Sequence, residues 1–494
     1  MPLRAKIRDP ASALGQTETD RISVEEMTEI QPLPDDEKDD VVFKIRGTVG
    51  MIQLNRPKKL NSLNGSMIRK IIPVLKRWET SDLVNCVVIS GAGGKAFCAG
   101  GDVAALALQN IKDGPPGQRE STEYFAVEYK LNHLIATYTK PYIAIINGIT
   151  MGGGMGLSCH APFRIATEKT LFAMPETDIG LFPDVGGGFF LSRLDGGIGP
   201  YLAITSSRLR GIQAYYAGVA THYTKSSTIP DLVDQLVTVC AKSLTREMSC
   251  PERLKVLNAF LTQYSTSTPH DDPIQLAGEL RLCIDEVFSL PTTVSQILDR
   301  LAAISEDGAS SRPKLLRDWA AKTRRAIVEG KSPTSMAVTL RQLEFAQQWD
   351  IKETFKMEHI VAATFMRHPD FVQGVKSKLI DKPASKPTWD PPTAGEVPNG
   401  VVDKFFQRPT GLPALKLFDE EHRENYTQYP HAWTALPSET RIRELLKAVP
   451  MDDSPAQTLR EIARQLGKDT GNIAGVYLKV MDVWSRVNMP RVAV

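Results

Sequence analysis

Residues 141–157 read PYIAIINGITMGGGMGL, an apolar run that leads into three consecutive glycines, Gly152, Gly153 and Gly154. The apolar run predicts a buried strand, and the glycines mark the turn from that strand into a helix. Backbone N–H groups at a helix start lack partners within the helix, and glycine lets a ligand approach them closely. The stretch therefore predicts either a donor site for developing negative charge or a tight packing turn.

A second glycine turn favours the donor site. Residues 95–103, KAFCAGGDV, follow the buried strand pattern CVVIS and precede the helical pattern DVAALAL. Two such turns can supply two backbone N–H donors to one oxygen. This arrangement polarises a thioester or ester carbonyl and stabilises its tetrahedral adduct.

Two acids stand in an unusually apolar stretch. Glu176 and Asp184 lie within residues 173–194, AMPETDIGLFPDVGGGFFLSRL, which is otherwise rich in leucine, phenylalanine, isoleucine and glycine. Burial raises the pKa of a carboxyl group and makes it a candidate general base near neutral pH. Taken singly, each acid also fits a helix cap or an exposed turn.

Composition argues against two classes of function. The 494 residues are 42% apolar and 23% charged, and the formal net charge is only +2, so we expect neither a nucleic-acid coating role nor a DNA partner. No apolar run approaches the roughly 20 residues that cross a bilayer, so we expect no transmembrane helix and no membrane partner.

Cofactor and metal patterns also fail. The histidines are scattered and the six cysteines form no C-x-x-C pair, which indicates reduced, buried thiols and no metal site. Residues 329–332, EGKS, end like a phosphate-binding loop, but Arg325 stands where the first glycine is required. Residues 152–156, GGGMG, lack dinucleotide-binding spacing. We therefore expect no cofactor.

The chain divides into four parts by pattern. Residues 1–38 are polar and aperiodic, which predicts a disordered or targeting extension. Residues 39–230 alternate buried strands with helices, which indicates a layered α/β core, and residues 231–395 are mainly helical. After the proline- and glycine-rich stretch 382–400, residues 396–494 predict a helical extension.

The motifs together resemble one family. NRPKKLNSLN, KAFCAGGD, ITMGGGMGLS, FAMPETDIGLFPDVGGG and SPTSMAVTLRQL occur in that order, and from about Val41 to Pro392 the chain resembles the 3-hydroxyisobutyryl-CoA hydrolase branch of the crotonase (enoyl-CoA hydratase/isomerase) superfamily. The resemblance implies a crotonase spiral of ββα units followed by a helical region. It also implies hydrolysis of 3-hydroxyisobutyryl-CoA in valine catabolism, in the mitochondrion, with CoA present only as part of the substrate.

The resemblance implies roles for particular residues. The N–H groups of Gly101 and Gly153 would bind the thioester oxygen, Glu176 matches the catalytic glutamate, Asp184 matches its partner acid, and Glu128 matches a substrate-binding glutamate. Glu176 would act as base for water or as nucleophile, and the sequence leaves both open.

Two further positions carry weaker expectations. Lys58, in the loop of residues 56–60, would lie against the CoA nucleotide. Hydratases of the superfamily carry a glutamate two residues after the three glycines, where this chain has Gly156. Water addition by two glutamates is therefore disfavoured, and hydrolysis fits better.

The extension beyond the resemblance leaves two readings. It is either a solvated packing element or a docking element, and its helical patterns carry the basic residues Arg441, Arg443, Lys447, Arg460, Arg464 and Lys468. Its stretch YPHAWTALPSE resembles fungal members of the family that are recruited to the small subunit of the mitochondrial ribosome. The partners implied are an acyl-CoA substrate and that ribosomal subunit, the second as an alternative structural function with or without hydrolase activity.

Overall fold

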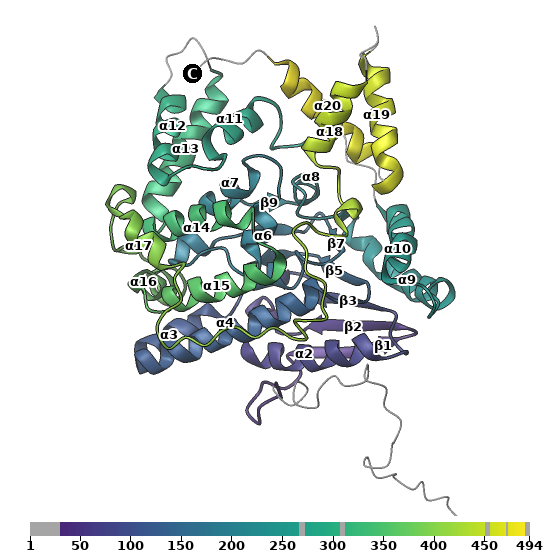
Figure 1. Cartoon of the computed structure of the whole chain (residues 1–494), viewed down its shortest axis with the longest axis horizontal. Helices are drawn as coiled ribbons and strands as arrows, with labels where there is room; N and C mark the ends of the chain where they lie inside the picture. Colours follow the sequence, from purple (N-terminus) through teal and green to yellow (C-terminus); the bar gives the residue numbers. More distant parts are fainter. Residues whose placement is uncertain (1–29, 266–271, 307–311, 450–454, 471–472, 490–494) are drawn as a thin grey trace, which may run out of the picture.

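The computed structural model describes residues 30–265, 272–306, 312–449, 455–470 and 473–489 (Figure 1). Within these residues the strands form a sheet of six, in the order β1-β2-β3-β5-β7-β10, and a sheet of four, in the order β4-β6-β8-β9. The strands are β1 (Val41–Arg46), β2 (Val49–Leu54), β3 (Cys86–Gly91), β4 (Ala96–Cys98), β5 (Tyr142–Ile146), β6 (Ile149–Met151), β7 (Phe163–Ala166), β8 (Leu171–Ala173), β9 (Leu209–Arg210) and β10 (His222–Tyr223).

Helices cover the sheets and make up most of the second half of the chain (Figure 1). They are α2 (Gly65–Thr80), α3 (Val103–Asp113), α4 (Pro115–Ala136), α5 (Gly153–Gly156), α6 (Gly187–Leu191), α7 (Ile198–Thr205), α8 (Gln213–Tyr216), α9 (Ile229–Ser243), α10 (Cys250–Tyr264), α11 (Gly278–Phe288), α12 (Val294–Glu306), α13 (Lys314–Gly330), α14 (Pro333–Ala346), α15 (Ile351–Phe365), α16 (Pro369–Val375), α17 (Asn399–Lys404), α18 (Glu439–Ala448), α19 (Pro455–Thr470) and α20 (Ile473–Asn488).

The predicted alternation of strands and helices is confirmed as a repeating unit. Successive strand pairs divide between the two sheets: β3, β5 and β7 pair in parallel in the large sheet, while β4, β6 and β8 pair in parallel in the small one. Each repeat therefore sends one strand to each sheet, which is the predicted spiral of ββα units. The carboxyl ends of parallel neighbours meet at the same edge, and this edge holds the candidate site.

Local sequence signals explain the start of the core. Strands β1 and β2 form a hairpin, with Gly47 at a φ of 58° in the turn. Helix α2 begins after Asn64, whose side chain accepts a hydrogen bond of 2.9 Å from the Met67 N–H. Ser66, the second residue of the helix, donates to the carboxylate of Asp40 over 2.6 Å.

Only part of the predicted N-terminal extension falls within the structure. Residues 1–29 lie outside the described residues, whereas residues 30–38 are described and are attached to the core at a few points. Ile30 is buried, and the Arg69 Nε atom donates to Asp36 over 3.1 Å. Glu37 accepts a hydrogen bond of 2.9 Å from the Nε atom of Arg56. The polar composition of residues 30–38 assigns them to the extension, but ion pairs connect them to α2 and to the loop after β2.

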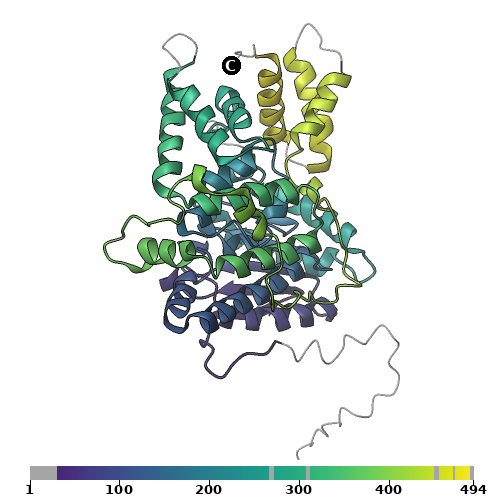
Figure 2. The same ribbon diagram turned by 60° about the vertical axis from the view of Figure 1, so that its left-hand side comes forward.

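The C-terminal part of the chain wraps around the core before it forms helices. Between α17 and α18 the backbone runs along α4 and α15 (Figure 1), where the Tyr426 hydroxyl donates to the Ala136 carbonyl over 2.9 Å. Helices α18–α20 then stand beside α11–α13 at one end of the molecule (Figures 1 and 2). The predicted helical extension is thus packed onto the core.

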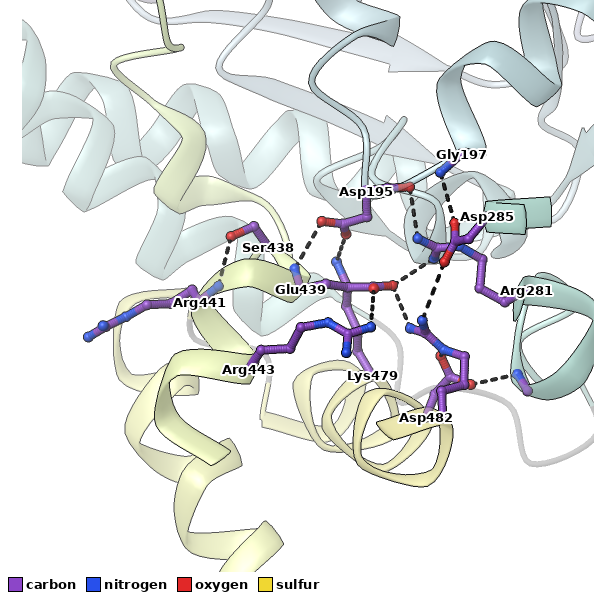
Figure 3. Close-up of polar contacts among 12 residues, drawn as sticks. Asp195, Gly197, Arg281, Asp285, Ser438, Glu439, Arg441, Arg443, Lys479 and Asp482 are labelled. Atoms are coloured by element: carbon purple, nitrogen blue, oxygen red, sulfur yellow. Dashed lines mark hydrogen bonds and ion pairs between the residues drawn. The ribbon is translucent and has the colours of Figure 1, made fainter. Parts of the chain in front are cut away.

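A buried ion network holds these helices in place (Figure 3). Glu439, at the start of α18, accepts from Arg281 of α11 over 2.6 Å and from Arg486 of α20 over 2.5 Å. Asp195 of the core accepts from Lys479 over 2.6 Å and from the Glu439 N–H over 2.9 Å. Because these groups are largely buried, each charge depends on its partner.

The basic residues of the extension are partly neutralised within it. Arg441 pairs with Glu444 over 3.1 Å and Arg464 pairs with Glu461. Arg443 lies 3.6 Å from Glu439, and the Lys468 side chain lies outside the description. Intrahelical pairing therefore weakens the case for docking by bulk positive charge.

Candidate active site

Three neighbouring parallel strands of the small sheet deliver the candidate residues to one edge. Gly101 follows β4, Gly153 follows β6, and Glu176 follows β8. Pairing of Ala96 with Ile149 and of Ile149 with Leu171 sets the three strands side by side. The glycine turns and the acid, which are far apart in sequence, therefore meet because their strands are adjacent.

The two glycines lie close together at the cavity. A Cβ atom built on Gly153 would lie 3.2 Å from the Gly101 amide nitrogen and 2.8 Å from Glu128 Oε1. In the described part of the chain, neither the Gly101 nor the Gly153 N–H donates a hydrogen bond to protein. Two backbone donors without a protein partner, both at the lining of one cavity, are the groups that an oxyanion hole requires.

The neighbouring glycines are explained by packing. Gly152 has a φ of 43°, and its added Cβ would lie 3.0 Å from Glu176 Oε1. A Cβ on Gly154 would lie 2.3 Å from the Cys98 carbonyl oxygen. Of the two readings of the glycine run, Gly154 thus serves the tight turn, while Gly153 faces the cavity.

Five carboxyl groups line the cavity, and three of them are buried. Glu128 of α4, Glu176 and Asp184 are 2%, 4% and 4% exposed. Glu128 Oε1 and Glu176 Oε2 have no hydrogen-bond partner among the described residues. Asp184 Oδ2 accepts a hydrogen bond of 2.8 Å from the Tyr129 hydroxyl. Buried, unpartnered carboxyl oxygens are costly, so their presence indicates a ligand that would satisfy them.

Burial sets the protonation of these acids. Desolvation raises the pKa of Asp184 to about 7, although the Tyr129 hydroxyl lowers it. Desolvation and the charge of Asp184 raise the pKa values of both Glu176 and Glu128 well above their ordinary range. Burial and mutual repulsion therefore favour the protonated forms of these neighbouring acids, and Asp184 is the acid whose pKa lies near neutral pH.

A cavity of about 540 Å³ connects these groups, with Gly101, Gly153, Glu128, Glu176 and Asp184 all in its lining. The structure therefore brings five of the six predicted site residues together. Lys58 is not brought to the lining, because it sits on the exposed 3-10 turn η3 (Pro57–Lys59).

The cation in the lining is Lys378, on the π-helical turn η6 (Lys376–Ile380) together with Leu379. Sequence reasoning missed it because only the tertiary fold brings this turn to the cavity. It also missed Tyr124 and Tyr129. Tyr124 precedes Glu128 by four residues, so its helical spacing was an available signal for the same face of α4.

Gly156, where the family resemblance places a glutamate in hydratases, has no room for a side chain. A Cβ on Gly156 would lie 2.6 Å from the Asn132 amide nitrogen and 2.8 Å from Val185 Cβ. A glutamate here would displace both neighbours. The packing therefore accounts for the absence of a second glutamate at this point.

The described residues contain no cluster of histidine, cysteine, aspartate and glutamate that could hold a metal ion. Among the helices described, none combines the length and the apolar character that crossing a bilayer requires.

Comparisons with known proteins identify the family. Residues 49–406 match the model of the enoyl-CoA hydratase/isomerase family. The chain is 46% identical over 451 residues to small ribosomal subunit protein mS47 of Neurospora crassa, covering 90% of this chain and 85% of that protein. It is 43% identical over 367 residues to the mitochondrial 3-hydroxyisobutyryl-CoA hydrolase of Danio rerio, covering 74% of this chain and 89% of that protein.

A solved structure agrees in fold. A carnitinyl-CoA dehydratase from Mycobacterium thermoresistibile superimposes with a TM-score of 0.65 at 32% identity, covering 77% of this chain and 99% of that one. The crotonase fold expected from the sequence is therefore confirmed, and the chain shares the mitochondrial location of its hydrolase relatives. The family match spans most of the sequence, and the two relatives align over 90% and 74% of this chain. The chain therefore belongs to the enoyl-CoA hydratase/isomerase family.

Proposed function

We propose that this chain hydrolyses 3-hydroxyisobutyryl-CoA to 3-hydroxyisobutyrate and CoA, a step of valine catabolism. The observation that carries the proposal is the pair of unpaired amides at Gly101 and Gly153, which share one cavity with Glu176 and Asp184. Relatives named as 3-hydroxyisobutyryl-CoA hydrolases, at 43% identity in Danio rerio, support the choice of substrate.

In this mechanism the thioester oxygen accepts hydrogen bonds from both glycine amides. Attack on the carbonyl carbon turns that oxygen into an oxyanion, and the two donors stabilise the developing charge. Loss of one such donor costs about 2.7–4 kcal/mol of barrier. The Gly101 and Gly153 amides belong to turns between strand and helix, so the backbone of the fold itself supplies both donors.

The carboxyl groups supply the nucleophile and the protons. Glu176 either removes a proton from the attacking water or attacks the carbonyl carbon itself to form an anhydride that water then opens. Asp184 orients this chemistry or delivers the proton that the leaving CoA thiolate takes up. Because these acids are buried close together, charge repulsion favours a state in which one acid is ionised and another is protonated.

Glu128 and Lys378 would bind the two ends of the substrate. The unpartnered Glu128 Oε1 atom can accept a hydrogen bond from the 3-hydroxyl group of the acyl chain. Lys378, at the cavity lining, would pair with a phosphate of CoA. In this proposal the enzyme needs no cofactor beyond the CoA that enters with the substrate.

Thiol release by the purified full-length chain from 3-hydroxyisobutyryl-CoA tests the proposal, with a colorimetric thiol reagent as readout. The variant Glu176→Gln should lose turnover but still bind the substrate. The matched control is Glu123→Gln, an exposed glutamate on the helix that carries Glu128, and it should keep full turnover. Unchanged turnover in Glu176→Gln would remove Glu176 from the mechanism.

A second function is supported by the extent of one comparison. The mS47 relative aligns over 90% of this chain, whereas the Danio rerio hydrolase aligns over 74%. We therefore propose, as the alternative, that the chain is a structural component of the mitochondrial small ribosomal subunit, with or without hydrolase activity. Sedimentation of native mitochondrial extract separates the proposals, because a ribosomal component migrates with the small subunit and a free enzyme migrates as a small particle.

A further inference from the structure

The loop that carries Asp184 is held in an unfavourable backbone conformation. Val185 has a φ of 55°, in the left-handed region that a β-branched residue rarely adopts. The residue is buried, and the next residue, Gly186, also has a positive φ, of 81°. Strain of this kind persists only where surrounding contacts enforce it, and it tends to occur at functional sites.

One set of contacts comes from the helical region. Glu358 of α15 is fully buried and accepts hydrogen bonds from the Gly186 N–H over 2.7 Å and from the Gly188 N–H over 3.0 Å. Gln342 of α14 donates to Glu358 Oε1 over 3.0 Å and to the Pro183 carbonyl over 3.1 Å. These bonds fasten the backbone on both sides of Asp184.

The second set of contacts passes through His160. Its Nε2 atom lies 2.9 Å from the Val185 carbonyl oxygen, which can only accept, so Nε2 carries the proton. Burial lowers the pKa of His160 to about 4, so the ring is neutral near pH 7 and its Nδ1 atom is an acceptor. The Tyr429 hydroxyl, 2.8 Å from Nδ1, is therefore the donor.

Tyr429 comes from the wrapped segment beyond residue 406, where the family match ends. Its ring packs edge-on against Phe189 at 4.9 Å between centroids, and the neighbouring Tyr426 is anchored to the Ala136 carbonyl. A hydrogen-bonded chain thus runs from the C-terminal segment through His160 to the residue next to Asp184.

We propose that Tyr429 is a positioning residue for Asp184: its hydroxyl fixes the tautomer of His160, whose Nε2–H in turn holds the Val185 carbonyl in the strained turn that presents Asp184 to the cavity. The catalytic part of the statement rests on the proposed hydrolase function. It assigns the C-terminal segment a role inside the active site, in addition to any role in docking.

The test compares Tyr429→Phe with Tyr426→Phe in the full-length chain. Both variants keep an aromatic ring and lose one hydroxyl, but only Tyr429 is bonded to His160. Hydrogen–deuterium exchange is measured by mass spectrometry on the peptide that contains residues 183–188, and kcat and KM are measured by thiol release.

Tyr429→Phe should speed exchange in this peptide and lower kcat about tenfold with little change in KM, because one buried hydrogen bond of the support is lost. Tyr426→Phe should change neither exchange in the peptide nor kcat. The variant His160→Gln, whose amide can still donate to the Val185 carbonyl, should be insensitive to a further Tyr429→Phe change.

The outcomes separate this proposal from the hydrolase proposal. Exchange that stays as slow in Tyr429→Phe as in the parent overturns the positioning role, whether or not the parent is active. Faster exchange without a fall in kcat, in a parent that turns over, also overturns it. A parent protein that releases no thiol refutes the hydrolase function. In that case, faster exchange in Tyr429→Phe but not in Tyr426→Phe still supports the hydrogen-bonded connection from Tyr429 through His160 to the Asp184 loop.

Discussion

Replacement of Gly153 by alanine tests the oxyanion hole directly. The added methyl group would lie 3.2 Å from the Gly101 amide nitrogen and 2.8 Å from Glu128 Oε1, in the space that the thioester oxygen must enter. Gly153 does not have a positive φ, so alanine can adopt its backbone conformation. The closest contact is the end of a glutamate side chain, which can move. The substitution should therefore damage the chemistry more than the fold.

The expected loss follows from the value of one donor. Blocking access to a single oxyanion donor costs about 2.7–4 kcal/mol, or roughly 10²–10³ in kcat. The methyl group obstructs approach to both amides, so the fall in kcat should be at least of this size. It is measured by thiol release from saturating 3-hydroxyisobutyryl-CoA, and Tm by calorimetry should stay within a few degrees of the parent.

Two further glycines calibrate the result. Gly154→Ala places a Cβ 2.3 Å from the Cys98 carbonyl oxygen, so it should lower Tm strongly as well as abolish activity. Gly395→Ala has no atom within 4 Å of the added Cβ and should change neither. If Gly153→Ala keeps more than half of the parent kcat at an unchanged Tm, the two amides do not hold the reacting oxygen.

Three other substitutions extend the reasoning. Burial raises the pKa of Asp184 from 3.8 to about 7, so ionisation of this acid progressively lowers the stability of the folded chain as pH rises from 3.8 to about 7. Calorimetry should therefore show that Asp184→Asn raises Tm at about pH 8 but not at about pH 4. Thiol release should show that the same substitution abolishes turnover at both pH values. Burial alone would raise the pKa values of Asp195 and Glu439, but Lys479 and the neighbouring arginines lower both, so the ion network that holds the extension is stable above about pH 4.5 and weakens as pH falls below it. Glu439→Gln should lower the free energy of unfolding by about 3–5 kcal/mol at pH 7, measured by denaturant unfolding. Equal stability of the parent and the variant would contradict the network. Lys378→Ala should raise KM for the CoA substrate severalfold with kcat unchanged, as thiol release would show. Lys376→Ala, at an exposed residue of the same turn that does not line the cavity, serves as its control.

The sequence predicted those parts of the site that depend on local motifs. Gly101, Gly153 and Glu176 each follow a short buried strand, so a linear pattern marked them, and parallel pairing of β4, β6 and β8 then brought them together. The role of Glu128 came only from the family resemblance, because a lone acid in a long helix carries no signal of its own.

Long-range packing explains what sequence reasoning missed. Lys378 reaches the cavity only because α16 and η6 fold back onto α3, and no local pattern records that approach. Glu358 lies in an ordinary helical pattern, yet the structure places it under the Asp184 loop with both oxygens occupied by backbone amides. Residues that support a loop from another element share no motif with it, so only the fold reveals them.

The energetics of the cavity bear on the choice between enzyme and ribosomal building block. Glu128 and Glu176 each bury a carboxyl oxygen without a partner in the described structure, and Val185 adds backbone strain beside Asp184. Each feature lowers the stability of the folded chain. An amide in place of either glutamate, or a smaller residue in place of Val185, would pack as well. A chain that served only as scaffold would be more stable without them. Their presence together around two unpaired amides therefore supports the proposed hydrolase function over a purely structural one.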